Sequence, residues 1–214
     1  MVSTKFIRQT KQLELLMTQM GQDCLKAIHG CKYALLKQDT IMLQEVDELH
    51  EQVTETGREC EQICMRILLL QHPVAKDLRR ITVATNTIRD FVRILDQCKE
   101  VADLICEQEM MSSLVDQSIE DLFEVAYEMI GQAIEAYVQR DEKVARDLIQ
   151  YDDKADQAYV YAKNFYVDKL AEKEEEPNVL VNLLLIGKYL ERICDHAANI
   201  GRWVLYQKNG VFEQ

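Results

Sequence analysis

The sequence predicts an all-α protein built from two tandem, pseudo-symmetric three-helix bundles. Three observations predict this fold: few residues that break helices, apolar residues at helical spacing through almost the whole chain, and a pattern of helix breaks that occurs twice. The 214 residues include only 7 Gly and 2 Pro, and good helix formers such as Leu, Glu, Gln, Lys and Ala dominate. Hydrophobic residues make up 48% of the chain, enough for one large core or two small ones.

Six helices are predicted, and several of their ends carry a sequence signal. Asp39 and Asp141 can cap the helices that follow them, and Pro73 and Pro177 stand near a first helical turn, where the missing N–H costs nothing. The acidic run at 172–176 is predicted to be a solvated loop. The predicted helices are 4–36, 39–70, 73–107, 113–138, 141–171 and 177–207.

The breaks between these helices repeat. The two intervals from a capping Asp to a Pro are nearly equal, and each is followed by a similar string, VRILD at 92–96 and ERICD at 191–195. Such self-similarity indicates a duplicated unit of a long helical hairpin and a third helix. We therefore assign residues 1–109 to the first repeat and residues 110–214 to the second. Helices of about 30 residues are about 45 Å long, so an elongated molecule is expected.

Apolar stripes in the third and sixth helices support bundling. Their members alternate between spacings of three and four residues, as in helices that pack along a seam. A helical core is the ordinary explanation. The stripe of the third helix is Leu78, Ile81, Thr85, Ile88, Val92 and Leu95. The stripe of the sixth helix is Leu183, Ile186, Leu190, Ile193, Ala197, Ile200 and Val204.

The net charge of -12 limits the partners of the bulk surface. Naked nucleic acid and anionic membrane surfaces would be repelled, so neither is an expected partner. An acidic surface suits cations or a basic protein surface, and it also simply keeps a helical protein soluble. Lys76, Arg79 and Arg80 form one basic patch, which is expected to neutralise Asp77 and nearby acids rather than to bind phosphate.

Cysteine usage and hydropathy indicate the cytoplasm. Seven Cys residues, an odd number without CxxC spacing, are expected to be reduced thiols packed as small apolar side chains. No signal peptide is evident at the start of the chain. The longest apolar stretch, residues 179–187, is far too short to span a bilayer, so no membrane insertion is expected.

Two pairs of carboxylates stand at the edge of apolar helix faces. Residues at i and i+4 share one helical face, so each pair can reach a common cation. Like charges so placed repel one another and lose hydration unless a cation compensates them. Arg93 or Arg192 can supply a salt bridge, and a divalent or trivalent metal ion can serve equally, so both interpretations stay open. The four carboxylates are Asp152, Asp156, Glu191 and Asp195.

Two strings resemble the PhoU family. Residues 189–200, YLERICDHAANI, are similar to the string that marks the last helix of PhoU proteins, and residues 71–81, QHPVAKDLRRI, resemble the family's P-x-A-x-D-L-R element. The resemblance extends from Phe6 to about Leu205. It implies a cytoplasmic, non-enzymatic regulator of the phosphate regulon. Such a protein contacts the ATPase of a phosphate ABC transporter and a sensor histidine kinase, and it dampens the starvation response when phosphate is plentiful.

The resemblance also implies a metal site of iron or zinc. The family's (E/D)xxxD motifs, which hold multinuclear clusters, match the two carboxylate pairs of the second repeat. The first repeat departs from the motif: Val92 stands where Glu191 would be, only Asp96 is kept, and His50 and Thr54 replace the other pair. We therefore expect one competent site, in the second repeat, and a degenerate one in the first.

Other functions fit the sequence less well or stay open. A ferritin-like di-iron oxidase needs ExxH motifs, and none of the four His residues lies three positions after a Glu. A purely structural bundle explains the stripes but not the carboxylates, and an accessory of another phosphate transporter stays open. No Gly-rich phosphate loop or nucleophile–base set indicates an NTPase or a hydrolase. A homodimer is the base-rate expectation for long amphipathic helices.

Overall fold

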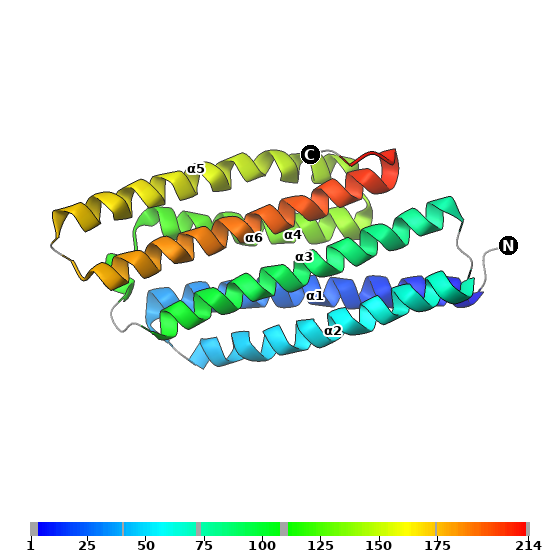
Figure 1. Cartoon of the computed structure of the whole chain (residues 1–214), viewed down its shortest axis with the longest axis horizontal. Coiled ribbons are helices and arrows are strands. Elements are labelled where there is room, and N and C mark those ends of the chain that lie inside the picture. The colour runs from blue at the N-terminus through cyan, green and yellow to red at the C-terminus, as the bar shows by residue number, and fades with distance from the viewer. Residues whose placement is uncertain (1–3, 40, 72–73, 108–110, 174, 213–214) are drawn as a thin grey trace.

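The protein, analysed as a computed structural model, consists of long helices, which confirms the predicted fold class (Figure 1). The structure describes residues 4–39, 41–71, 74–107, 111–173 and 175–212, and this part of the chain contains no strand. A short 3-10 turn, η1, spans Met111–Leu114. The six α-helices are α1 (Thr4–Lys37), α2 (Ile41–Gln71), α3 (Ala75–Cys106), α4 (Gln117–Gln139), α5 (Glu142–Glu172) and α6 (Pro177–Asn209).

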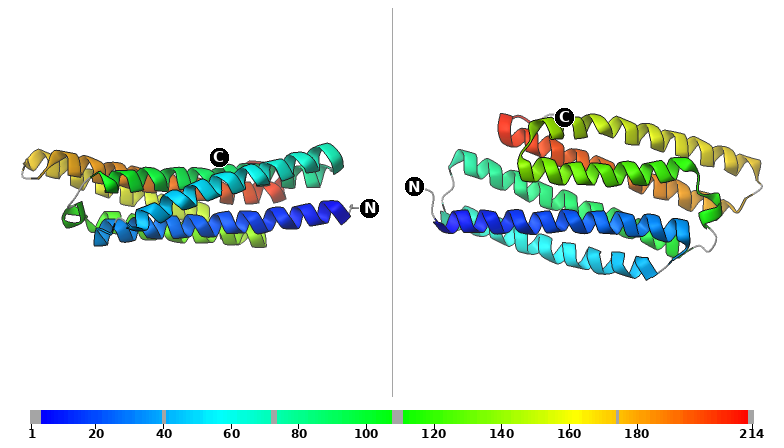
Figure 2. Two further views of the ribbon diagram at one scale, coloured as in Figure 1. Left: turned by 90° about the horizontal axis from the view of Figure 1, so that it is seen from below. Right: turned by 180° about the vertical axis from the view of Figure 1, so that it is seen from behind.

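The helices form a flat, elongated molecule of two layers (Figures 1 and 2). Helices α3 and α6 run antiparallel at the middle of one face, while α1 and α4 do the same on the opposite face. Helices α2 and α5 form the two long edges. Within each repeat all three helices contact one another, and the repeats meet through α3 against α6 and α1 against α4.

The helix ends follow the predicted signals where the structure describes them. The Asp141 carboxylate caps α5 by accepting from the backbone N–H groups of Lys143 and Val144, at 2.8 and 3.3 Å. The Asp39 carboxylate accepts from the N–H of Ile41 at 3.0 Å, which confirms its capping role. Pro177 is the first residue of α6, as predicted.

Three helix starts differ from the prediction by two residues or more. The second helix begins at Ile41 rather than 39. The fourth helix begins at Gln117 rather than 113, because Asp116 is its N-cap and accepts from the N–H of Ser118 at 3.0 Å. The third helix begins at Ala75, and the predicted role of Pro73 lies outside the described residues. The acidic loop is also one residue shorter than predicted, because Glu172 ends α5.

One continuous hydrophobic core runs through both repeats. All seven stripe residues of α6 are buried, as predicted, and so are six of the seven cysteines, Cys106 being exposed. All seven cysteines are free. The prediction is wrong for Leu78, which is 48% exposed, because the first turns of α3 extend past the end of α6 (Figure 1).

The assignment of residues 1–109 and 110–214 to separate repeats stays a prediction. The boundary falls at residues that the structure does not describe, and the core continues across it. None of the described helices combines the length and the apolar character needed to cross a bilayer.

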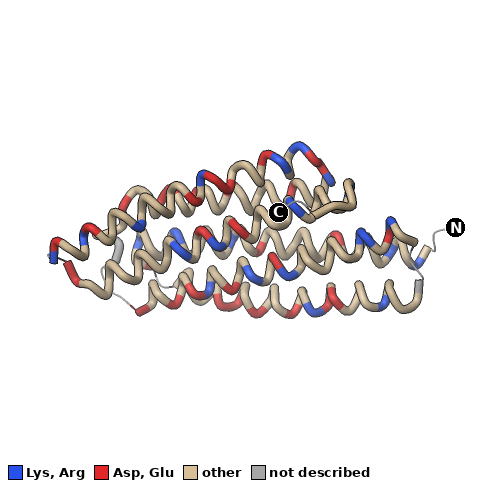
Figure 3. Tube along the Cα trace, turned by 45° about the horizontal axis from the view of Figure 1, so that its top comes forward, with Lys and Arg blue, Asp and Glu red and all other residues tan. Residues whose placement is uncertain are grey.

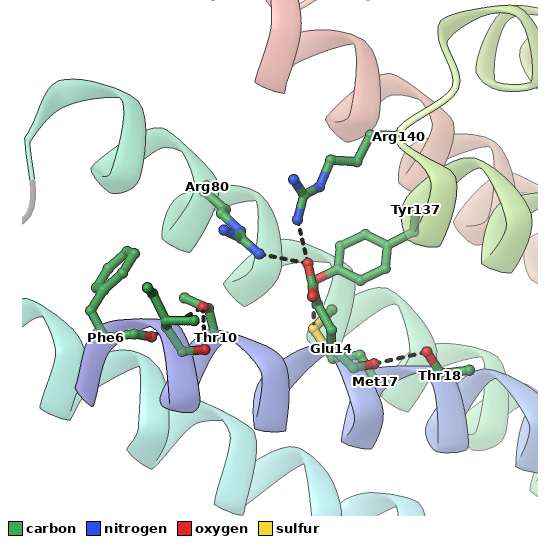
Figure 4. Close-up of polar contacts among 9 residues, drawn as sticks. Phe6, Thr10, Glu14, Met17, Thr18, Arg80, Tyr137 and Arg140 are labelled. Atoms are coloured by element: carbon green, nitrogen blue, oxygen red, sulfur yellow. Dashed lines mark hydrogen bonds and ion pairs between the residues drawn. The ribbon is translucent and has the colours of Figure 1, made fainter. Parts of the chain in front are cut away.

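A polar cluster ties the repeats together at one end of α1 (Figure 4). The carboxylate of Glu14 accepts from Arg80 of α3 at 2.6 Å and from Arg140, which ends α4 in a left-handed conformation. Beside it the Tyr137 hydroxyl lies 2.9 Å from the sulfur of Met17. Glu14 is thus the acid that Arg80 neutralises, and one carboxylate links three helices.

Two glycines distinguish the tight and open parts of the α1–α4 contact. A Cβ at Gly21 would lie 2.5 Å from Cγ1 of Ile134, whereas a Cβ at Gly131 would meet nothing within 4 Å. We expect Gly21→Ala to destabilise the protein by about 1–2 kcal/mol, because overpacking outweighs the gain in helix propensity. Gly131→Ala should stabilise it by about 0.5–1 kcal/mol, since it gains propensity without a clash. Urea unfolding of both variants tests the pair, and stabilisation by Gly21→Ala would contradict this packing.

Candidate functional site

The structure brings the four predicted carboxylates to one place on the seam between α5 and α6. Their common neighbour is the fully buried thiol of Cys194. Burial raises the pKa of this thiol well above its ordinary value, and the charges of all four carboxylates raise it further. All four acids therefore lie near enough to this thiol to act on it electrostatically. They are Asp152, Asp156, Glu191 and Asp195.

The two pairs differ in depth in the way that helical rotation predicts. The side chain of Glu191 is only 12% exposed and that of Asp152 only 14%. Asp156 and Asp195, one turn further along their helices, are exposed. Each helix thus contributes one inner and one outer carboxylate, and the inner ones are largely out of water.

This placement makes the charge of Asp152 costly. The pKa of its carboxyl is raised from the ordinary 3.8 to about 6, first by burial and then by the charge of Asp195. Arg202 opposes the shift, and Asp156 adds to it. The site therefore holds more negative charge than its own side chains compensate.

Two other basic residues act as counter-ions in this arrangement. Arg202 approaches Asp152 with 3.5 Å between Nη2 and Oδ2, and Lys188 pairs with Glu191 one turn away. Arg192, one of the two arginines that the sequence left open for this role, lies with its guanidinium 6.0 Å from the ring centre of Tyr189. No described cation forms an ion pair with either outer carboxylate.

The acids fit a metal site in chemistry and position but are not arranged as a ready set of ligands. Carboxylate oxygens from two adjacent helices suit iron and are accepted by zinc. In the described part of the chain, no three His, Cys, Asp or Glu side chains come close enough together to hold one ion. Ligation thus requires Arg202 and Lys188 to turn away and the exposed Asp156 and Asp195 to turn inward.

The equivalent place in the first repeat is neutralised by protein groups. His50 of α2 lies with Nε2 3.0 Å from Oδ1 of Asp96, and Arg93 donates to Oδ2 of the same carboxylate at 3.0 Å. Val92 packs half-buried against the core. Both oxygens of the one retained acid therefore already have partners, and Arg93 serves its own repeat.

One buried polar pair was not predicted. His196 of α6 lies with Nδ1 3.0 Å from Oδ1 of Asp90 on α3, so the pair joins the two repeats. Burial raises the pKa of the Asp90 carboxyl, and His196, Arg89 and Arg202 oppose the shift. The burial of Asp90 could have been predicted from its spacing from Thr87 and Ile94, because this spacing places the acid on a second buried stripe of α3.

The fold and the seam together define a class: a tandem three-helix-bundle protein with an acidic cluster on the hairpin and third helix of its second repeat. The model of the PhoU domain matches the chain twice, at residues 17–105 and 119–204. The chain therefore belongs to the PhoU family.

Similar proteins support this membership over the full length. The chain is 28% identical to the "Phosphate-specific transport system accessory protein PhoU homolog" of Pseudomonas aeruginosa, with 98% of this chain and 88% of the relative covered. It is 26% identical to the homolog of the same name from Borreliella burgdorferi, with 94% and 95% covered.

Solved structures of the family have the same fold. The crystal structure of PhoU from Pseudomonas aeruginosa superposes with a TM-score of 0.90 at 26% identity, with 96% of this chain and 100% of that one covered. The phosphate transport system regulatory protein PhoU from Streptococcus pneumoniae superposes with a TM-score of 0.88 at 22% identity, with 95% and 97% covered. At 22% identity, the similarity to the Streptococcus pneumoniae protein shows a shared fold alone.

The raised pKa of Asp152 predicts a pH-dependent stability in protein kept free of metal by a chelator. The folded chain holds this proton more tightly than the unfolded chain, so its stability falls as pH rises from about 4 to about 6. Asp152→Asn cannot ionise, and it should therefore stabilise the protein by about 1–2 kcal/mol at pH near 7.5 and by little at pH near 4. Urea unfolding at the two pH values measures this difference.

Asp153→Asn is the matched control, because Asp153 is the exposed neighbour of Asp152. It should change the free energy of unfolding little at either pH. A loss of stability in Asp152→Asn near pH 7.5 would show that Arg202 compensates the carboxylate fully.

Proposed function

We propose that this chain is a regulator of phosphate uptake and of the phosphate-starvation response that acts by protein contacts. Its partners are the ATPase of a phosphate ABC transporter and a sensor histidine kinase, and it works in the cytoplasm as a homodimer without an enzymatic activity of its own. The observation that carries the proposal is the match to phosphate-transport accessory proteins over nearly the whole length of both chains.

The acidic cluster on α5 and α6 is proposed to bind iron or zinc in this regulator. A cation held by Asp152, Asp156, Glu191 and Asp195 would supply the positive charge that the seam lacks. The raised pKa of Asp152 and the weak approach of Arg202 support the proposal, because both mark an incompletely compensated acidic site. The first repeat needs no such ion, since Asp96 is already satisfied by His50 and Arg93.

The geometry favours a binding site over a ferritin-like oxidase. Such an oxidase projects Glu and His ligands together into the bundle core. Here His50 and His196 are paired with Asp96 and Asp90, apart from the acidic cluster. The four acids lie at the edge of the seam rather than in its centre. Oxygen consumption after addition of Fe(II) separates the two functions, and rapid catalytic turnover would favour the oxidase.

Metal content tests the proposed site. Purified wild-type protein loaded with iron or zinc and then desalted should retain metal, whereas Asp152→Asn and Glu191→Gln should each lose most of it, because each removes an inner carboxylate. Asp153→Asn, the exposed control, should retain the wild-type amount. Unchanged metal content in both site variants would sink the proposed metal site.

A pull-down tests the proposed partners. The tagged chain should capture the transporter ATPase and the sensor kinase of its own organism, and a chelator should weaken the capture if the metal orders the contact surface. Capture of neither partner would contradict the regulatory function. Capture of components of a different phosphate transporter would instead favour an accessory role there.

A further inference from the structure

One end of this acidic molecule is basic. Helices α1, α2 and α3 meet there, with the first turns of α1 and α3 and the last turns of α2 (Figure 1). Residues 4–13, 62–70 and 74–88, which we name the basic end, contain seven Lys or Arg residues and a single acid, Asp77. The whole chain has 37 acids against 25 bases, so this end departs sharply from the rest. Figure 3 shows the start of α3 mainly in blue.

Some of these bases are used internally and others face solvent. Arg80 pairs with Glu14, and Arg79 lies 5.9 Å from the ring centre of Tyr206 and donates to the carbonyl of Gln207 at 3.5 Å. The other five bases have exposed side chains and lie on all three helices of the basic end. They are Lys5, Arg8, Lys11, Arg66 and Lys76.

Large apolar side chains are exposed among these charges. Leu69 and Leu70 lie in the last turn of α2, Val74 is the N-cap of α3 and Leu78 lies in its first turn, so four of them lie near this hairpin. Leu69 is 68% exposed and Val74 is 67% exposed, which is costly for aliphatic side chains unless they are covered part of the time. Ile7 of α1 and Met65 of α2 are also exposed, at 47% and 54%.

The hairpin that corresponds in the second repeat has the opposite character. It lies at the other end of the molecule, between α5 and α6 (Figure 1). Residues 168–176 there carry five acids and two lysines. The elongated protein is therefore electrically polarised, with a basic, apolar end and an acidic one.

We propose that the basic end is a peripheral binding site for an anionic lipid bilayer. Arg66 and Lys76 lie at the level of the lipid headgroups, and Leu69, Leu70 and Val74 insert their side chains at the boundary with the acyl chains. Apolar residues flanked by Lys and Arg bind anionic membrane surfaces in this way, each base contributing to the attraction. The acidic remainder of the protein is repelled, so the molecule stands end-on with the α5–α6 hairpin away from the lipid. The proposal is independent of the partners and the metal site proposed above.

The shape of this end favours a bilayer over a protein partner. A docked peptide helix needs a groove between elements. The hollow beside Leu69 is lined by one helix alone, through Arg58, Glu61, Gln62, Met65 and Arg66. Exposed apolar side chains near the ends of α2 and α3, with bases beside them, match a soft planar surface instead.

Vesicle sedimentation with the full chain tests the proposal. We expect the wild-type protein to bind phosphatidylcholine vesicles that contain about one third phosphatidylglycerol and to bind pure phosphatidylcholine at least about tenfold more weakly, with binding reduced by salt. Arg66→Glu combined with Lys76→Glu should weaken binding about tenfold or more. Leu69→Ser combined with Leu70→Ser should also weaken it, because the apolar anchor is lost. All four residues are exposed, so the variants should keep their fold, which thermal melting verifies.

Matched changes on α5 provide the controls. Lys154→Glu combined with Lys163→Glu changes the same charge, and Val160→Ser combined with Val167→Ser removes similar exposed apolar surface. Both should bind like the wild type, because neither changes the basic end. Absence of binding by folded wild-type protein, equal binding to neutral vesicles, or equal losses in the controls would each overturn the proposal. If the wild-type protein does not bind vesicles but the basic-end variants lose regulation in cells, the basic end binds a protein partner instead.

Discussion

The packing of α3 against α6 is the constraint on which the rest of the structure depends. Each of these third helices is apolar on the side that faces its own hairpin and on the side that faces its counterpart. Leu190 and Ile193 on α6, and Ile94 on α3, are fully buried. A separated repeat would expose one of these faces to water, at about 25 cal/mol for each Å². The repeats therefore share one core, and the antiparallel α3–α6 pair fixes where α2 and α5 lie.

The partners of the buried acids near this seam differ with the distance of each acid from the centre of the seam. Asp90 lies within it and is held by His196 from the other repeat, since a buried carboxylate without a partner would be costly. Asp152 and Glu191 lie further from the centre, where α5 meets α6. Arg202 comes only to 3.5 Å from Asp152, and Lys188 pairs with Glu191. This incomplete compensation of negative charge destabilises the protein without metal. It also makes the binding of a cation favourable, because the cation would supply the missing positive charge.

Local periodicity was sufficient to predict the helices, the stripe of α6 and the position of the carboxylate pairs at the edge of apolar faces, because each depends on rotation about a single helix axis. The partners of charged side chains were not predictable in this way. Arg140 reaches Glu14 across 126 positions of the chain, and Arg202 reaches Asp152 across 50. The prediction that Leu78 is buried was wrong for a related reason. Its exposure depends on where α6 ends relative to α3, and the spacing of residues within α3 holds no information about that.

The duplication has kept the architecture of the two repeats while separating their chemistry. In the first repeat His50 and Arg93 saturate Asp96, so that seam needs no ion, and the exposed charge lies instead at the α2–α3 hairpin. In the second repeat the hairpin is acidic and the seam retains uncompensated carboxylates. Because a pseudo-twofold arrangement puts the two hairpins at opposite ends, the two specialised regions cannot interfere sterically. The proposed lipid contact at the basic end therefore leaves the acidic seam open to a cation.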